Sequence, residues 1–265
     1  MNEIVIPQYH EPSITNAAKY VDYIIKKKKI VVPDIPKVCF ILYSRHLIDT
    51  ILSTTPSLKI DIGSRNRTEI HFCYPENSVP FAVIGEQLGA SMAVVVLEEL
   101  VALGFSTFIA MGTTGHPTRG AEPQANIGDF VLVKDALIYE GTSSHYEPGI
   151  TISQADISLL NDLSGILKKA NVSFVEGRIA TTDALYRETP QFISKILDEG
   201  AFAIDMETSA LYTAARFHHK RICALLYISD KVCINDNWDV DFVAGNIDIA
   251  EKQSASLIKV LVENI

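Results

Sequence analysis

Short apolar runs alternate along most of this chain with longer segments in which apolar residues recur at helical spacing. The short runs predict β-strands at 38–42, 69–74, 80–85, 105–111, 130–138, 173–181, 200–204 and 221–229. The longer segments predict helices at 13–29, 90–103, 153–170, 190–199 and 241–263, with a further helix of small residues after Glu207. Strands that alternate with helices indicate a three-layer α/β/α fold, in which helices cover both faces of a central mixed, largely parallel sheet.

The chain divides by composition into a short arm and one domain. Residues 1–36 are punctuated by prolines and contain one predicted helix, for which Ser13 is a candidate N-cap. Residues 37–265 contain no internal repeat and no low-complexity linker, so we expect them to form a single domain. A chain of 265 residues is long enough to bury a sizeable core.

Composition and charge favour a globular protein that binds a small molecule. Hydrophobic residues make up 48% of the chain and charged residues 21%, which is ordinary globular usage. The formal net charge of −9 argues against a general nucleic-acid surface, and the short basic run at 26–29 is typical of a solvated helix end. No apolar run reaches the length of a membrane span and the N-terminus lacks a signal-peptide pattern, so we expect a cytoplasmic protein.

The four cysteines indicate neither a metal site nor a disulfide framework. Cys39, Cys73, Cys223 and Cys233 form no C-x-x-C pair. Three of them lie in strand-like runs, where a thiol packs as a small apolar side chain. We therefore expect no zinc site and no disulfide.

Three acidic residues stand where predicted strands end. Asp205 and Glu207 follow the strand at 200–204, and Asp230 follows the strand at 221–229. In an open α/β sheet, ligands bind in the crevice at the carboxyl ends of the strands, so these acids are candidates for catalysis or substrate binding. The alternative is that they are helix-capping and turn acids.

Two loops after strands carry further candidate ligand contacts. Gly112, Thr113, Thr114 and Gly115 follow a buried strand, and their amides and hydroxyls can hold an anion, although a plain turn is an equal alternative. Their spacing fits neither a Walker motif nor a dinucleotide fingerprint. The loop at 84–90 opens a helix in a similar way, and the polar, aromatic loop at 139–146 is typical of a functional segment.

The segment Thr181–Thr189 ends another predicted strand. There Tyr186 can stack on a planar base, and Arg187 can donate a hydrogen bond to an acceptor on that base. The alternative is a helix start at which Asp183 and Thr189 serve as caps.

Several of these motifs, taken in order, carry a resemblance to a known family. They are GEQLGA, MGTTG, NIGDFVLVKDALIYEGTSSHY, TTDALYRET, AIDMETSALY and YISD. Together they resemble the nucleoside phosphorylase/nucleosidase superfamily, which includes purine nucleoside and uridine phosphorylases. The resemblance runs from about residue 38 to 240, and its most specific part is DMETSALY followed by the later SD. One branch of the superfamily also has an EPS-containing arm, TTDA-x-YRET and a late WD, which here are Glu11–Ser13, Thr181–Thr189 and Trp238–Asp239.

The resemblance implies a role for each residue that matches a family motif. It implies that Glu207 binds the ribose 2′- and 3′-hydroxyls, that Met206 packs on the sugar, and that Asp230 assists departure of the base. Ser229 would orient Asp230. Asp205 stands where the family usually has a glutamate, and its shorter side chain argues for a supporting position. These roles agree with the chemistry, because cleavage of an N-glycosidic bond builds a cationic sugar and an anionic base.

The anion site departs from the family pattern. Phosphorylases of the family have a Gly-Asp-Pro loop after the first strand and an arginine two residues before the glycine of MGTTG, whereas this chain has residues 42–46 and Ala110 at those places. Thr113 still matches a phosphate-binding hydroxyl. Arg45, Arg65 or Arg67 can supply the missing charge, the last two across a subunit interface, with surface solvation as their alternative. His10 resembles a histidine that reaches a neighbouring subunit's ribose, with an ordinary loop residue as the alternative.

The resemblance implies an enzyme that cleaves a nucleoside, with purine favoured because the uridine-specific glutamine and arginine are absent after TTDALY. Inorganic phosphate would be the co-substrate, free base and ribose 1-phosphate the products, and purine salvage the context. No cofactor and no metal are expected, and the assembly would be a homodimer or a hexamer of dimers. The alternatives are a nucleosidase that uses water and a nucleoside-binding protein without turnover.

Overall fold

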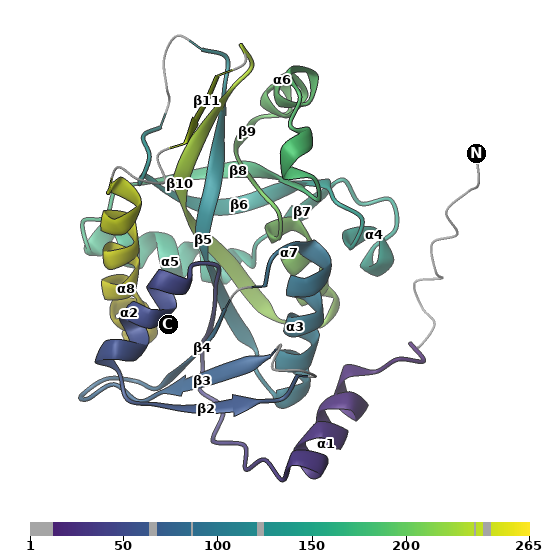
Figure 1. Ribbon diagram of the computed structural model, residues 1–265, viewed down its shortest axis with the longest axis vertical. Coiled ribbons are helices and arrows are strands. Elements are labelled where there is room, and N and C mark those ends of the chain that lie inside the picture. Colours follow the sequence, from purple (N-terminus) through teal and green to yellow (C-terminus); the bar gives the residue numbers. More distant parts are fainter. Residues whose placement is uncertain (1–12, 64–67, 86, 121–124, 236, 241–244) are drawn as a thin grey trace.

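The computed structural model describes residues 13–63, 68–85, 87–120, 125–235, 237–240 and 245–265. Within these residues the chain forms one mixed sheet with helices packed against it (Figure 1). The strands are β1 (Cys39–Leu42), β2 (Ser57–Asp61), β3 (Glu69–Cys73), β4 (Phe81–Gly85), β5 (Thr107–Thr118), β6 (Phe130–Tyr139), β7 (Ile152–Gln154), β8 (Phe174–Thr182), β9 (Ala201–Asp205), β10 (Arg221–Cys233) and β11 (Asn237–Val240). The helices are α1 (Ala17–Lys28), α2 (Arg45–Thr54), α3 (Ala90–Leu103), α4 (Ser143–Tyr146), α5 (Ile157–Lys169), α6 (Pro190–Asp198), α7 (Thr208–Phe217) and α8 (Asn246–Asn264), with a 3₁₀ turn at Leu185–Arg187.

The sheet is mixed, with parallel and antiparallel pairs interspersed along the strand order. Strand β1 lies parallel to β4 and β5, β5 lies parallel to β10, and β8 lies parallel to both β6 and β9. The pairs β2–β3, β3–β4, β6–β7, β6–β10, β5–β9 and β10–β11 are antiparallel. Because β10 pairs with both β5 and β6, the strands β5, β10, β6, β8 and β9 close into a ring. The predicted mixed sheet is confirmed, but its largely parallel character is not, because antiparallel pairs are as prominent as parallel ones.

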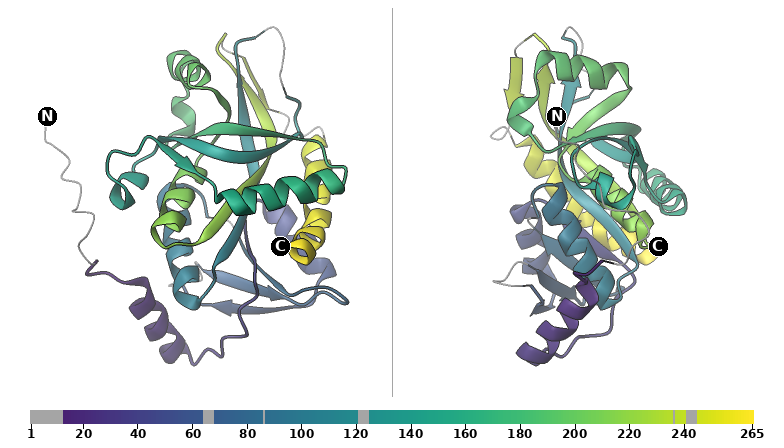
Figure 2. Two further views of the ribbon diagram at one scale, coloured as in Figure 1. Left: turned by 180° about the vertical axis from the view of Figure 1, so that it is seen from behind. Right: turned by 90° about the vertical axis from the view of Figure 1, so that its right-hand side faces the viewer.

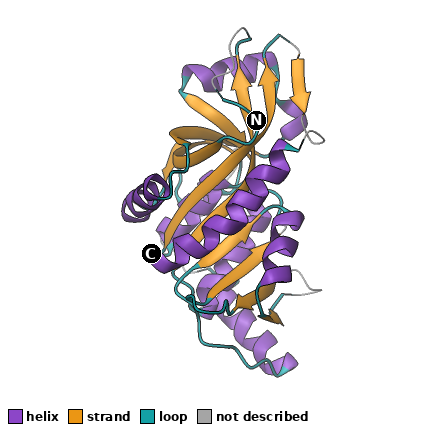
Figure 3. Ribbon diagram, turned by 90° about the vertical axis from the view of Figure 1, so that its left-hand side faces the viewer, coloured by secondary structure: helices purple, strands orange, loops and turns teal. Residues whose placement is uncertain are grey.

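Two pairs of helices flank the central strands. Helices α2 and α8 contact each other on one side of β5, and α3 and α7 contact each other on the other side (Figures 1 and 3). Strand β1 and the first halves of β5 and β10 are buried between these pairs, which explains their apolar sequence. No helix of the described residues is both long enough and apolar enough to cross a membrane.

Helix α1 is attached to the sheet domain by apolar contacts. It packs against α3, and its Val21 belongs to the main hydrophobic cluster (Figure 2). The cap of α1 differs from the prediction, because the Asn16 side chain, and not that of Ser13, accepts the backbone N–H of Lys19. The division into an arm at 1–36 and a single domain at 37–265 stays a prediction.

Several boundaries differ from the sequence prediction, for physical reasons. Strand β5 continues to Thr118, so the glycine-threonine segment predicted as a loop is strand, held by its pairing with β10. Strand β10 likewise continues to Cys233, and Asp230 lies inside it at a register shift. Helix α2 and strand β2 were not predicted. The helix predicted from residue 153 begins at Ile157, where Asp156 caps it, and the last helix begins at Asn246.

Candidate active site

The three acids singled out in the sequence lie in or just after two strands that both pair with β5. Asp205 ends β9, Glu207 immediately precedes α7, and Asp230 lies in β10. Gly115 of β5 connects them, because it pairs with Ile204 on one side and with Asp230 on the other. A Cβ atom at Gly115 would lie 3.4 Å from Asp230 Oδ2, so glycine leaves space beside that carboxylate.

Asp205 is buried among hydroxyls and caps the following helix. Its Oδ1 accepts a hydrogen bond from Thr181 Oγ1 at 2.6 Å. Its Oδ2 accepts the backbone N–H of Thr208 at 2.9 Å and also the Thr208 hydroxyl. Burial raises the pKa of this carboxyl, and the hydrogen bonds from Thr181 and Thr208 oppose that effect. These contacts match the helix-capping alternative, since they tie the start of α7 to β8.

Glu207 is buried at the junction of α7 and α3. Its side chain makes no capping bond to its own helix, and its Oε1 instead accepts the backbone N–H of Gly89 at 2.6 Å. Gly89 precedes α3 with a φ of 87°, a conformation that favours glycine. Burial, reinforced by the charge of Asp205, raises the pKa of Glu207 to about 8. Met206 is half-buried beside it.

Asp230 is held by hydrogen bonds to both of its carboxylate oxygens. Ser229 Oγ donates to Oδ1 at 2.6 Å, and Trp238 Nε1 of β11 donates to Oδ2 at 2.7 Å. The side chain is buried and belongs to a strand, so the turn-acid alternative for Asp230 is wrong. The structure thus brings Ser229 to Asp230, as the resemblance implies, and adds Trp238, which the sequence did not place at the site.

A pocket opens beside Trp238 between β10 and the 3₁₀ turn. Its volume is about 240 Å³, and its walls are mostly apolar and aromatic. It is lined by Leu185, Tyr186, Glu188, Pro190, Ile193, Val232, Cys233, Ile234 and Trp238. Tyr186 therefore lies at the pocket, with 84% of its surface exposed, and Arg187 is exposed beside it. Glu188 is the carboxylate of this pocket, a position the sequence named only as a departure from the uridine pattern.

Glu188 is electrostatically linked to Asp230. Burial, reinforced by the charge of Asp230, raises the pKa of Glu188 to about 7. Between its ordinary value of 4.5 and about 7, the folded protein therefore binds more protons at this group than the unfolded chain does. The stability contributed by this group is fully present below the ordinary value and is lost as the pH rises through about 7.

A Glu188→Gln variant should accordingly lose part of the pH dependence of folding. We expect its free energy of unfolding to fall less than that of the wild type between pH values of about 4.5 and about 7. Urea denaturation at several pH values measures this difference, with Glu176→Gln on the exposed surface of β8 as the control. Parallel wild-type and Glu188→Gln curves would contradict the linkage.

The candidate anion residues lie along β5 and α2. Thr113 is exposed on β5, whereas Thr114 is buried and its hydroxyl donates to the Ile204 carbonyl at 2.6 Å. Arg45 begins α2, is largely exposed and pairs with Asp49 at 3.0 Å. Arg65, Arg67, His10 and Glu86 lie outside the described residues. The assignments to phosphate stay predictions.

Tyr43 is a residue of this region that sequence analysis missed. Its backbone N–H donates to the Met111 carbonyl at 3.0 Å, and its side chain packs directly on Gly112. Its hydroxyl is buried without a hydrogen-bond partner among the described residues. Burial raises the pKa of Tyr43 well above its usual value, and the charges of Glu207 and Asp205 raise it further. The available signal was its position, one residue after β1, in place of the family's Gly-Asp-Pro loop.

The contact of Gly112 with Tyr43 predicts a stability effect. A Cβ added at Gly112 would lie 2.7 Å from Tyr43 Cβ, an atom fixed by the backbone. We expect Gly112→Ala to destabilise the fold by about 1–3 kcal/mol, because the added methyl group overpacks a buried strand. Thermal or urea denaturation measures the change. Gly165→Ala in α5 is the matched control, since its Cβ meets no atom within 4 Å, and an equal loss in both variants would contradict the argument.

Comparison with known proteins places this arrangement in a family. The sequence model described as "Phosphorylase superfamily" matches residues 37–263. The chain is 28% identical over 159 residues to a guanosine phosphorylase of Halorubrum lacusprofundi, covering 60% of each protein. It is 29% identical over 163 residues to a uridine phosphorylase of Thermococcus kodakarensis, covering 56% of this chain and 57% of the relative. The matched segments thus span about 60% of the length of these relatives.

Solved structures support the same fold at lower identity. The purine nucleoside phosphorylase of Toxoplasma gondii in complex with immucillin-H aligns with a TM-score of 0.76 and 18% identity, covering 87% of this chain and 92% of the other. The 5′-methylthioadenosine/S-adenosylhomocysteine nucleosidase of Campylobacter jejuni aligns with a TM-score of 0.71 and 18% identity, covering 87% of this chain and all of the other. Because the family match extends over most of the chain, this protein belongs to the phosphorylase superfamily.

Proposed function

We propose that this protein cleaves the N-glycosidic bond of a nucleoside, with a purine base favoured, by phosphorolysis to the free base and ribose 1-phosphate. The observation that carries the proposal is the setting of Asp230. Its carboxylate is buried and held by Ser229 and Trp238, and Trp238 also lines a pocket whose aromatic and apolar walls suit a planar base. The names of the relatives, which are phosphorylases of nucleosides, support this reading.

Each carboxylate has its own task in the proposed reaction. Breaking the glycosidic bond leaves positive charge on the sugar and negative charge on the departing base. Glu207, fixed by the Gly89 amide, would accept hydrogen bonds from the ribose hydroxyls, with Met206 against the sugar. Asp230 would carry the proton that neutralises the base, and Ser229 and Trp238 would hold it in position. Asp205 would act by fixing the start of α7, on which the position of Glu207 depends.

Pocket residues beyond these would select the base. Tyr186 and Trp238 offer aromatic faces at the pocket, and Glu188 offers a carboxyl group whose raised pKa allows it to donate or accept a hydrogen bond near neutral pH. Arg187, exposed beside the pocket, would contact an acceptor on the base.

Phosphate would bind at Thr113 and the nearby backbone of Gly112, with charge from Arg45 or Arg67.

One observation favours water as an alternative nucleophile, and with it a nucleosidase. Tyr43 packs on Gly112, and its buried hydroxyl has no partner in the part of the chain that the structure describes. A phenol in that place can hold a water molecule, and its bulk reduces the space for a tetrahedral anion.

A panel of purine and pyrimidine nucleosides, assayed with and without inorganic phosphate, tests the proposal. We expect release of purine bases and formation of ribose 1-phosphate only when phosphate is present. Release of free ribose without phosphate would establish hydrolysis instead. Binding of nucleosides without any base release, under both conditions, would establish a binding protein.

A further inference from the structure

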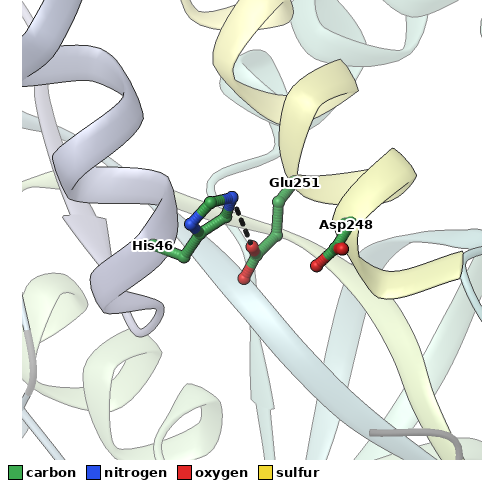
Figure 4. Close-up of side chains that lie close together, drawn as sticks. All are labelled: His46, Asp248 and Glu251. Carbon is green, nitrogen blue, oxygen red and sulfur yellow. Dashed lines mark ion pairs between the residues drawn. The ribbon is translucent and has the colours of Figure 1, made fainter. Parts of the chain in front are cut away.

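Helices α2 and α8 bring together three side chains that are far apart in the sequence. His46 lies in the first turn of α2, and Asp248 and Glu251 lie one turn apart near the start of α8 (Figure 4). Each side chain offers one ligand atom, and these atoms all lie within 4.8 Å of one another. His46 and Asp248 are exposed, so the cluster is open to solvent on one side.

Glu251 is the buried member of the cluster, and two hydroxyls fix its orientation. Only 7% of its side chain is exposed. The Ser44 hydroxyl donates to its Oε1, and the Tyr227 hydroxyl donates to the same oxygen at 3.1 Å. Its second oxygen, Oε2, faces His46 Nε2 at 3.8 Å, which is longer than a hydrogen bond. A carboxylate that is more than nine-tenths buried therefore directs one oxygen into the cluster.

We propose that His46, Asp248 and Glu251 form a binding site for a divalent transition-metal cation, with Zn²⁺ the best match. An imidazole nitrogen with two carboxylate oxygens is a ligand set that zinc accepts, at distances of about 2.0–2.2 Å. Two such ligands around a tetrahedral ion lie about 3.4 Å apart, so the observed 3.8 Å needs only a small side-chain adjustment. Water would complete the coordination on the exposed side. The hydroxyls of Ser44 and Tyr227 supply the outer hydrogen bonds that orient a metal-binding carboxylate.

The simpler reading of the cluster is an ion pair between His46 and Glu251 that joins the two helices. The two readings differ at Asp248. An ion pair does not require Asp248, whereas a three-ligand site does. The metal-site interpretation also predicts a weaker response to Mg²⁺ than to Zn²⁺. Mg²⁺ prefers oxygen ligands and keeps its water shell, whereas the imidazole of His46 favours zinc.

This site is separate from the groups assigned to nucleoside cleavage, but the residues that hold it are neighbours of those groups. Ser44, which holds Glu251, directly follows Tyr43, and Tyr227, which also holds Glu251, pairs in register with Thr113. Bound zinc would therefore join α2 to α8 next to the segments proposed to receive the nucleophile. The test reads binding and stability, so its outcome does not depend on the enzymatic proposal.

Calorimetric titration of chelator-treated protein with ZnCl₂, and in parallel with MgCl₂, tests the site. We expect one Zn²⁺ per chain, a rise in melting temperature with Zn²⁺, and no comparable response to Mg²⁺. His46→Gln and Asp248→Asn should each weaken zinc binding about tenfold or more and remove the rise in melting temperature. His145→Gln and Asp49→Asn, at exposed positions outside the cluster, are matched controls that should bind zinc as the wild type does.

Three results would overturn the proposed zinc site. Zinc binding that is unchanged in both cluster variants would place the ion elsewhere. Absence of stoichiometric binding in the wild type would leave the His46–Glu251 ion pair as the role of the cluster. Loss of binding in His46→Gln but not in Asp248→Asn would exclude the three-ligand site. Both variants alter exposed side chains, so circular dichroism should show that each is folded.

Discussion

Replacing Asp230 by asparagine is expected to lower kcat/KM for nucleoside cleavage by about 10²- to 10⁴-fold, the usual effect of removing a positioned proton donor. Asparagine has nearly the same shape and can keep contacts to Ser229 and Trp238, which now hold both carboxylate oxygens. The fold should therefore survive while proton transfer to the base is lost. Steady-state release of the base measures the change.

The control for this variant lies on the same hairpin. Asp239→Asn alters an exposed acid of β11, whose backbone pairs with Lys231, and it should leave kcat/KM unchanged. A nucleoside with an activated leaving base should lose less rate in Asp230→Asn than an ordinary one, because it needs less help from a proton donor. Unchanged activity of Asp230→Asn on an ordinary nucleoside would remove Asp230 from the mechanism.

Replacing Glu207 by glutamine is expected to lower kcat/KM by about 10²- to 10³-fold, because a charged acceptor for two ribose hydroxyls becomes a neutral amide. The pKa of Glu207 is raised to about 8, so only part of the free protein carries the ionised group near neutral pH. If the ionised carboxylate binds ribose, the wild-type KM falls as the pH rises toward about 8. This pH dependence should disappear in Glu207→Gln.

Two further variants identify the group responsible for the pH dependence of KM. Glu188→Gln removes another carboxyl with a raised pKa, the one at the pocket, and should keep the fall of KM with pH. Glu176→Gln, on the surface of β8, should leave both kcat and KM unchanged. If the fall of KM with pH persists in Glu207→Gln but vanishes in Glu188→Gln, Glu188 causes the pH dependence, and the assignment of ribose binding to Glu207 is wrong.

Individual strands show which parts of the fold the local sequence pattern could predict. The apolar runs of β1, β4 and β10 identify buried strands, because a strand covered on both faces has few polar positions. The end of β5 could not be found in this way, since its Gly-Thr-Thr-Gly sequence is typical of a turn. Its long pairing with β10 overrides that local preference. Strand β2 was missed because three of its five residues are exposed, which leaves a weak apolar signal.

Among the site residues, the sequence by itself determined the acids, and it did so through motif and position. Glu207 and Asp230 were identified because they follow predicted strands, where ligands bind in an open α/β sheet, and because they match family motifs. Which partners they find was decided only by tertiary structure. Asp205 is taken up by hydroxyls of Thr181 and Thr208, while Asp230 receives Ser229 and Trp238.

The sequence thus determined the fold class, the family resemblance and the candidate acids, because these depend on local pattern and on motifs a few residues long. Only the tertiary structure decided that Tyr43 packs on Gly112, that Glu188 lies in the field of Asp230, and that Glu251 of α8 meets His46 of α2. These contacts join segments widely separated along the chain. Their geometry follows from how helices and strands pack, and no local sequence pattern carries that information.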